Sequence, residues 1–179
     1  DSDLPSAGGA EIAQQVRGVA EGAPSIYLAL NQAAETMRPM IGPETIILPM
    51  LNGVPWWFVT GQQLKSVDPD GSIAAALSVE RIVGCVVHAS CSRSAPNRIQ
   101  VKHAEKLILG EPRGGASERV ERLCCLFEKS GIRCEASDNV RRAIWYKLWG
   151  NATINPLSAL TRATCDQILA DPDCRDWML

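Results

Sequence analysis

The sequence lacks the patterns that most readily assign a protein to a class. It contains no G-x-G-x-x-G, the glycine-rich turn that cradles a dinucleotide's pyrophosphate. No apolar run approaches the ~20 residues of a membrane-spanning helix, and no basic-then-apolar signal opens the chain, so we expect no membrane association. The 18 Lys and Arg and 20 Asp and Glu residues give a net charge of −2. Nothing in that balance favours nucleic acid as a partner.

Cysteine and histidine also lack the spacing of a metal site. The seven cysteines form no C-x-x-C pair, and neither of the two histidines stands at ligand spacing from them. We therefore expect no metal, reduced thiols and a cytoplasmic location. Cys124 and Cys125 are interpreted as helix packing residues. His88 is interpreted as a structural residue at the end of a strand, and His103 as a solvent-facing one.

With 179 residues, the chain can bury a core of its own as one or two domains. Residues 1–24 are rich in Gly, Ala and Ser and predict an irregular lead-in. Beyond residue 24, hydrophobic periodicity predicts alternating helices and strands. The strands predicted at 81–89, 98–103 and 106–110 are joined by short connections, which indicates an antiparallel meander with a turn at Ala104–Glu105 between the last two. The predicted helices are 25–40, 117–130 and a third that starts after 138, and the predicted strands are 45–51, 81–89, 98–103, 106–110 and 132–136.

The stretch 138–161 is the most informative part of the sequence. Asp138 is a good N-cap for an apolar helix, in which Lys147, Asn151 and Asn155 follow one another at intervals of four residues. At roughly 100° per residue, that spacing places the three polar groups along one side of the helix. A bound polar ligand would explain such a stripe. Two alternatives stay open: Lys147 can extend its ammonium to solvent, and Asn155-Pro156 can begin a new helix.

A second polar feature follows the predicted strand 45–51. That strand ends at Asn52-Gly53, and ligands of α/β sheets gather beyond the carboxyl ends of strands. The dipeptide alone also fits a tight hairpin turn. The bulky residues 54–58 that follow do not alternate as a returning strand would, which argues against the hairpin.

Taken together, these motifs resemble the ketopantoate reductase (2-dehydropantoate 2-reductase) family. The resemblance rests on the Asn-Gly strand end, Gly-x-x-x-His-Ala at 84–89, Leu-Gly-Glu at 109–111 and, above all, the run from Asp138 to Thr161. It extends from about Ser25 to the C-terminus. It implies an NADPH-dependent reductase of a 2-keto acid, with the active site between a Rossmann domain and a helical domain.

The family's functional residues carry over to positions of this sequence by resemblance. Lys147 matches the catalytic lysine, which protonates the alcohol oxygen as hydride reaches the ketone carbon. Asn52 matches a residue that contacts both cofactor and substrate, and Asn151 and Asn155 match substrate-binding asparagines. Ser90 falls where the family contacts the cofactor through a small residue.

The expected fold is α/β: a partial Rossmann-type sheet with antiparallel strands, followed by the start of an all-helical C-terminal domain. Its predicted divisions are residues 1–24, the remainder of the dinucleotide-binding domain at 25–137, and the start of the helical substrate or dimerisation domain at 138–179. Because the glycine-rich turn is missing, the chain is expected to be a middle fragment that binds NADPH weakly or not at all.

Two other functions stay open. The chain can be a non-catalytic remnant that acts only as an oligomerising or interaction module, or it can belong to a related β-hydroxyacid or opine-type dehydrogenase. The resemblance implies a small-molecule ketoacid as the substrate, and a homodimer is one assembly that it allows.

Overall fold

The structure is a computed structural model that describes residues 31–178. It divides into two compact units: Ala34–Leu148 form one, and the other includes Trp149–Leu179. The predicted irregular segment 1–24 and the first residues of the predicted helix 25–40 lie outside the described residues. The domain boundary predicted before residue 138 stays a prediction.

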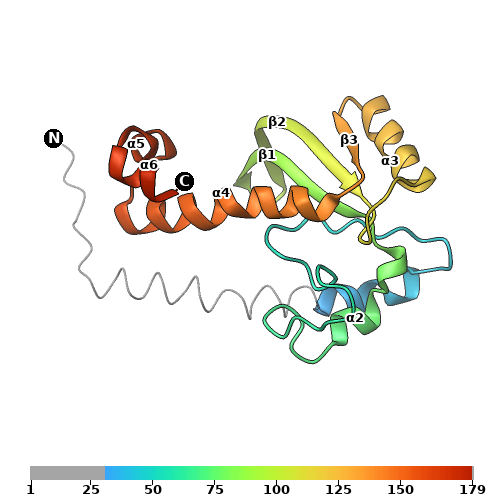
Figure 1. The fold of residues 1–179 in the computed structure, drawn as a ribbon. Coiled ribbons are helices and arrows are strands. Elements are labelled where there is room, and N and C mark those ends of the chain that lie inside the picture. Colours follow the sequence, from blue (N-terminus) through green and yellow to red (C-terminus); the bar gives the residue numbers. More distant parts are fainter. Residues whose placement is uncertain (1–30, 179) are drawn as a thin grey trace. The chain divides into compact units, whose positions relative to one another are not determined.

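A three-stranded sheet with the order β1-β2-β3 organises the unit 34–148 (Figure 1). Strands β1 (Gly84–Ala95) and β2 (Arg98–Gly110) form a long antiparallel hairpin. Strand β3 (Cys134–Ser137) pairs with β2 in parallel. The crossover that a parallel pair requires is helix α3 (Glu118–Lys129). The expected α/β class, with antiparallel strands in the sheet and a helical part after it, is confirmed.

The predicted meander is wrong, because the chain does not turn at Ala104–Glu105. Strand β2 passes through both residues without reversing, so the two strands predicted at 98–103 and 106–110 are one. In the hairpin, His88 pairs with Lys106 and the next residue, Ala89, pairs with Ala104. Glu105 is therefore an extra residue, a β-bulge, and the interruption of the sequence pattern marks a bulge.

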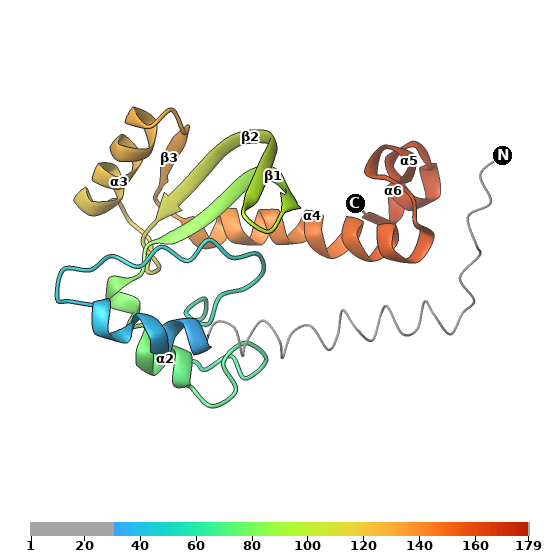
Figure 2. The same ribbon diagram turned by 180° about the vertical axis from the view of Figure 1, so that it is seen from behind.

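The hairpin turn itself is short, and the strands are longer than the sequence predicted. The turn occupies Pro96 and Asn97, within the predicted loop 92–97. Figure 2 shows the hairpin from the opposite side, with β1 and β2 extending together beyond the part that pairs with β3. Most residues of the outer hairpin are exposed on both faces, whereas the inner residues Gly84–Val86 are all buried.

The buried strand predicted at 45–51 is reduced to one bridge. Only Ile47 pairs, in parallel with Ile82: its N–H donates to the carbonyl of Arg81 at 2.8 Å, and its carbonyl accepts from Val83 at 3.0 Å. Pro49 has no N–H to continue a ladder on this side. The run is hydrophobic enough for a strand, but among residues 31–178 it pairs only with the segment 81–83.

The main core lies between the sheet and α3. It combines alternate strand residues with the inner face of the helix. Ser117 caps α3, its hydroxyl accepting from the N–H of Val120 at 3.3 Å, and Gly131 follows the helix with φ +80°. The predicted bounds of this helix are confirmed. Cys124 packs in the core as predicted, but Cys125 is exposed, so its interpretation as a packing residue is wrong. The buried residues of this core are Val83, Cys85, Leu107, Leu109, Val120, Cys124 and Cys134.

Two glycines on the other face of the sheet make room for the start of α4 (Val140–Thr161). Gly84 and Gly110 pair across the hairpin, and Val140 packs over both. A Cβ on Gly84 would lie 2.9 Å from a methyl carbon of Val140, and one on Gly110 would lie 2.8 Å from the Cβ of Val140. Val140 is fully buried as a result. The glycine pair therefore fixes where α4 begins.

Asn139 caps α4 and the predicted N-cap Asp138 does not. The Asn139 side-chain oxygen accepts from the N–H of Arg142 at 3.1 Å. Asp138 instead uses its backbone carbonyl to accept from Gly115 at 2.7 Å. Both residue types are good caps, and the burial of Val140 selects the register in which Asn139 stands just before the helix.

The remaining helices of the unit 34–148 lie before the sheet in sequence. The described part of the first predicted helix is α-helical at 31–37 and ends in the 3-10 turn Arg38–Met40. Helix α2 (Ser72–Ala76) and the 3-10 turn Val79–Arg81 precede β1. Asp68 is buried beside α2, and its two carboxylate oxygens accept from the N–H groups of Ile73 at 3.1 Å and Ala74 at 3.0 Å.

The unit that includes 149–178 contains the rest of α4 and two short helices, α5 (Cys165–Ala170) and α6 (Pro172–Met178). A capping box between Thr164 and Gln167 begins α5. The indole N–H of Trp149 donates to the backbone carbonyl of Met178 at 3.2 Å, which ties the helix pair back to α4. Among residues 31–178, no helix combines the length and the hydrophobicity that crossing a membrane requires.

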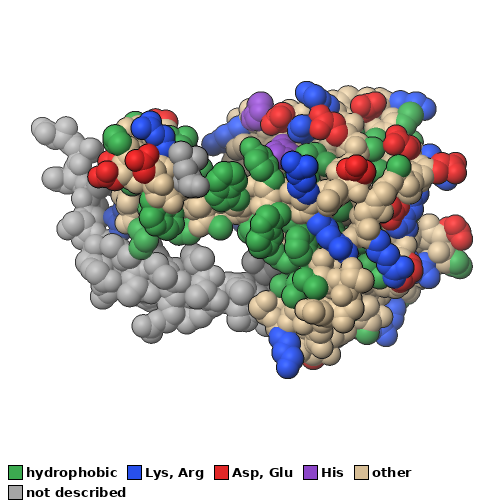
Figure 3. Space-filling view, in the orientation of Figure 1, with side chains coloured by type: hydrophobic (Ala, Val, Ile, Leu, Met, Phe, Trp, Pro, Cys, Tyr) green, Lys and Arg blue, Asp and Glu red, His purple; other side chains and the backbone are tan. Residues whose placement is uncertain are grey.

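Large hydrophobic side chains reach the surface in several places. Figure 3 shows such side chains between charged ones rather than fully covered by them. The most exposed include Met40 at the end of its 3-10 turn, Ile99 and Val101 on the outer hairpin, and Tyr146 on α4. Trp145 is also exposed, but its ring stacks on Phe58 with the ring centroids 5.9 Å apart.

Candidate functional site

Lys147 is the central residue of the predicted site. It lies on α4 and is half-buried, and its ammonium donates a hydrogen bond to the backbone carbonyl of Val87 on β1. An ammonium has three N–H donors, and this contact uses one of them. Two donors are therefore left for an oxygen acceptor of a bound molecule.

The surroundings of Lys147 favour its neutral form. Burial lowers the pKa of Lys147 below its ordinary value of 10.5, and Cys85 opposes that effect. Burial also raises the pKa of the Cys85 thiol to about 12. Cys85 is thus an uncharged thiol at neutral pH and no counter-ion for the lysine. Among the ion pairs of the described residues, none includes Lys147. A half-buried ammonium without a carboxylate partner suits a group that meets negative charge on a ligand.

The other four predicted site residues have polar side chains that could form hydrogen bonds with a ligand. Asn52 is exposed and follows the segment in which Ile47 pairs with Ile82. Ser90 is exposed and lies on β1. Further along α4, Asn151 is half-buried and Asn155 is exposed. Within residues 31–178, none of these four side chains makes a hydrogen bond.

The structure connects only part of this set. Lys147 meets β1 at Val87, three residues before Ser90 in sequence. Asn151 and Asn155 share the continuous helix α4 with Lys147, at the spacing of about one turn that places side chains on one side. No hydrogen bond in the described part of the chain joins Lys147 to Asn52 or Ser90. The role of each residue stays a prediction.

Helix α4 decides one of the alternatives that the sequence left open. It runs without interruption from Val140 to Thr161, with Pro156 in its interior. Asn155 therefore does not cap a new helix. Proline in a helix leaves the carbonyl four residues earlier without its usual partner. The helix nonetheless keeps Asn155 on the same element as Lys147.

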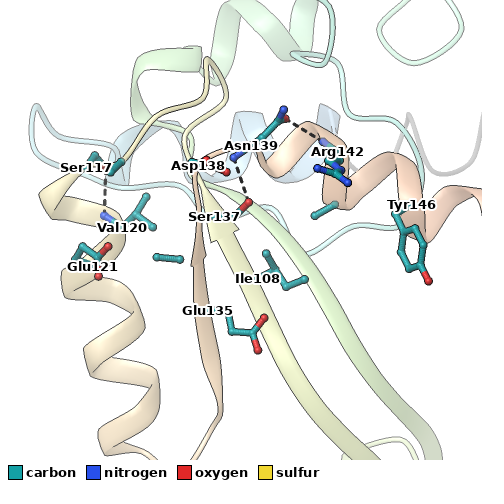
Figure 4. Close-up of a pocket in the computed structure, with 13 residues that line it drawn as sticks. Ile108, Ser117, Val120, Glu121, Glu135, Ser137, Asp138, Asn139, Arg142 and Tyr146 are labelled. Atoms are coloured by element: carbon teal, nitrogen blue, oxygen red, sulfur yellow. Dashed lines mark hydrogen bonds between the residues drawn. The ribbon is translucent and has the colours of Figure 1, made fainter.

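A cavity that contains none of these residues lies elsewhere in the unit 34–148. Figure 4 shows it between α3, the edge strand β3 and the start of α4. Its volume is about 780 Å³, and none of the five predicted site residues lines it. Several of its polar groups serve the fold: Ser117 and Asn139 cap the two helices, and Glu135 pairs with Lys106 at 2.8 Å. We assign no catalytic role to this cavity.

Sequence reasoning missed the groups that hold Lys147. The backbone carbonyl of Val87 carries no side-chain signal, and Val87 stands 60 positions before the lysine. For the basic pair Arg141-Arg142, the sequence predicts a solvated helix face. Arg142 is exposed, but Arg141 is half-buried and donates to the hydroxyl of Thr60 at 2.7 Å. The helical spacing of Val140 and Ile144 was the available signal, since Arg141 adjoins the buried face.

Comparison with known proteins adds the family. The family model described as "Ketopantoate reductase PanE/ApbA C terminal" matches residues 139–179. A curated 2-dehydropantoate 2-reductase from Mesorhizobium japonicum is 38% identical over 154 residues, which are 82% of this chain and 47% of that protein. The chain belongs to the ketopantoate reductase family. The resemblance drawn from the sequence is confirmed.

Solved structures from this family have the same fold. A crystal structure from Ralstonia solanacearum MolK2, described as that of a ketopantoate reductase, is 46% identical with a TM-score of 0.80, covering 84% of this chain and 49% of that one. The 2-dehydropantoate 2-reductase from Geobacter metallireducens GS-15 is 28% identical with a TM-score of 0.69, covering 84% of this chain and 46% of that one. The chain thus spans about half the length of the relatives that it matches.

Proposed function

We propose that this chain supplies the proton donor and the substrate contacts of a reductase that acts on a 2-keto acid, ketopantoate or a related compound, with NADPH as the reductant. The observation that carries the proposal is the half-buried ammonium of Lys147, fixed by the Val87 carbonyl and unpaired with any carboxylate of the described residues. Membership of the ketopantoate reductase family supports the reaction class.

Lys147 acts on the oxygen of the ketone. NADPH, when bound, supplies the hydride that adds to the ketone carbon. Negative charge then develops on the oxygen, where an ammonium stabilises it electrostatically and delivers a proton. The lowered pKa of Lys147 makes its ammonium a stronger acid than an exposed lysine, which favours this transfer. The neutral amine afterwards regains its proton from water.

The asparagines orient the substrate in this proposal. Asn151 and Asn155 follow Lys147 along α4, and their amides can both donate and accept hydrogen bonds without adding charge. Such groups suit the carboxylate and hydroxyl of a hydroxylated 2-keto acid. Asn52 is proposed to contact both substrate and cofactor, and Ser90 the cofactor. Neither side chain makes a hydrogen bond within the described part of the chain, which is compatible with these roles.

The residues present fit only the reacting end of NADPH. Asn52 and Ser90 offer polar groups for it, but the 179 residues contain no G-x-G-x-x-G to hold the pyrophosphate. We therefore propose that these residues alone bind NADPH weakly or not at all. Calorimetric titration of the 179-residue chain with NADPH tests this statement, and micromolar affinity would contradict it.

The catalytic proposal is tested in the complete protein that carries this sequence. Oxidation of NADPH is followed with ketopantoate and a panel of other 2-keto acids. A Lys147→Ala variant is expected to lose about 10²- to 10⁴-fold in kcat, the usual contribution of a positioned acid or oxyanion donor. Lys102→Ala, which removes an exposed lysine from β2, is the matched control and is expected to keep its activity. Equal kcat values in both variants would refute the role of Lys147.

A further inference from the structure

A second cavity, of about 410 Å³, is separate from the proposed reductase residues. None of the five predicted site residues lines it. Its walls are mostly the segment 56–64, the region from α2 to the 3-10 turn at 79–81, and two arginines, Arg113 and Arg141. The volume lies in the range of about 300–1,000 Å³ that is usual for small-molecule sites.

Two buried N–H donors without an acceptor belong to residues that line this cavity. They are the indole Nε1 of Trp57 and the guanidinium Nε of Arg141, and neither finds a hydrogen-bond partner among residues 31–178. Trp57 is only 7% exposed, so water does not reach most of this residue. Both atoms can donate and neither can accept. A buried donor without an acceptor costs free energy, and a ligand oxygen that comes within hydrogen-bond distance of it would remove that cost.

The charge on the cavity walls favours an anion. Arg141 has only the neutral hydroxyl of Thr60 as a partner in the described part of the chain. The two acidic groups on the walls are already engaged. Asp68 accepts from two backbone N–H groups, and Glu80 pairs with Arg113 at 2.9 Å. Arg141 is therefore the positive charge in this cavity that no carboxylate of the described residues balances.

The apolar part of the walls restricts the anion further. Four apolar residues are among those that line the cavity: Trp56, Trp57, Leu77 and Val79. A bare, strongly hydrated ion such as phosphate gains nothing from such walls, whereas an acid with an apolar body does.

We propose that this cavity binds a small organic carboxylate. Its carboxylate accepts hydrogen bonds from Arg141 and from the indole N–H of Trp57, and its apolar body packs against Leu77 and Val79. A charge-assisted pair with arginine and a neutral indole bond together fix the orientation of the ligand. The site is independent of the reductase proposal, since it shares no residue with it.

The test uses the indole N–H signals of the ¹⁵N-labelled chain, with benzoate as the probe. The sequence has five tryptophans, and the Trp57 signal is assigned by triple-resonance experiments on the unsubstituted protein. We expect this signal to move on addition of benzoate and to reach saturation. Arg141→Gln is expected to weaken benzoate binding at least tenfold. Arg122→Gln, which removes an exposed arginine of α3, is expected to leave it unchanged.

Three results would overturn the proposal. A Trp57 signal that does not respond to benzoate would show that no carboxylate binds beside this indole. An equal response in the Arg141→Gln variant would remove the arginine from the site. A stronger response to inorganic phosphate than to benzoate would exclude the carboxylate class. The titration of the unsubstituted protein decides the first and third even if the Arg141 variant does not fold.

Discussion

Replacing Gly110 with alanine is expected to destabilise the unit 34–148 because the new methyl group meets backbone. Its Cβ would lie 2.6 Å from the carbonyl oxygen of Ser137 and 2.8 Å from the Cβ of Val140. Carbon atoms in contact normally lie about 3.5–4.0 Å apart. The start of α4 would have to move away from the sheet to accept the methyl group.

The expected magnitude follows from two opposing effects. Overpacking costs about 1–3 kcal/mol, and a clash with backbone belongs at the upper end of that range. Alanine also lowers the entropy of the unfolded chain, which offsets about 0.7 kcal/mol. The net loss is about 2 kcal/mol, or a fall of roughly 6–12 °C in Tm for a unit of this size.

The neighbouring Gly84 provides a contrast, since its clashes are with side chains. A Cβ there would lie 2.9 Å from Val140 Cγ1 and 2.9 Å from the ring of Trp57. Truncating Val140 to alanine removes the first clash but keeps the Cβ that Gly110→Ala would strike. In double-mutant cycles, Val140→Ala should therefore restore about 1 kcal/mol of the unfolding free energy that Gly84→Ala loses. It should restore none of the unfolding free energy that Gly110→Ala loses.

Thermal and urea unfolding of these variants measure the effect. Gly150→Ala is the control, because this glycine lies inside α4 with nothing within 4 Å of its missing Cβ. Alanine there should stabilise the protein by about 1 kcal/mol, the opposite sign. A Gly110→Ala variant as stable as the unsubstituted protein would refute the close packing of Val140 on the glycine pair. Equal rescue of both glycine variants by Val140→Ala would refute the distinction between them.

Three further predictions concern titrating groups. If Lys147 is the proton donor, kcat/KM, which reports the free enzyme, falls as pH rises through the pKa of Lys147. Burial places that fall below 10.5 in a profile of kcat/KM against pH, and a limb above that value would contradict the assignment. The Arg119 guanidinium lowers the pKa of Glu111, so Glu111 stabilises the fold above its ordinary pKa of 4.5 and this stability is lost as pH falls through the lowered value. Urea midpoints of Glu111→Gln should therefore lie below those of the unsubstituted protein at neutral pH and approach them in acid, and a constant difference would exclude the pair. Burial raises the pKa values of Cys85 and Cys134 to about 12, so iodoacetamide at mildly alkaline pH should label neither thiol before denaturant is added, as peptide mass spectrometry would show; early labelling would place them at the surface.

The sequence predicted correctly those elements whose first and last residues are determined by neighbouring residues in the sequence. Helix α3 is the clearest case, because Ser117 supplies its cap, Gly131 its terminating left-handed residue, and the spacing of Val120 and Cys124 its buried face. Strand β3 was also predicted close to its observed bounds. In each case the deciding groups lie within a few residues of one another.

Tertiary contacts decided the elements that the sequence misplaced. Asp138 and Asn139 are equally good caps, and only the packing of Val140 over the glycine pair selects Asn139. Glu105 looks like part of a turn, but the hairpin accommodates it as a bulge. The segment around Ile47 has the composition of a strand, and strand formation also needs a partner that the sequence pattern cannot supply.

The candidate site shows the same division. The helical spacing of Lys147, Asn151 and Asn155 was visible in the sequence, and one continuous helix carries all three. The carbonyl that holds Lys147 was not visible, since any residue type can provide a backbone carbonyl. The cavity beside Trp57 was equally hidden, because its two unpartnered donors come from positions far apart in the sequence.

Chemical rescue tests most directly whether Lys147 delivers the proton. The Lys147→Ala variant of the complete protein is assayed for NADPH-dependent reduction of ketopantoate with and without added ethylammonium. We predict that the variant is nearly inactive alone and that its activity rises in proportion to the ethylammonium concentration. Full activity of Lys147→Ala without any added amine would contradict the assignment.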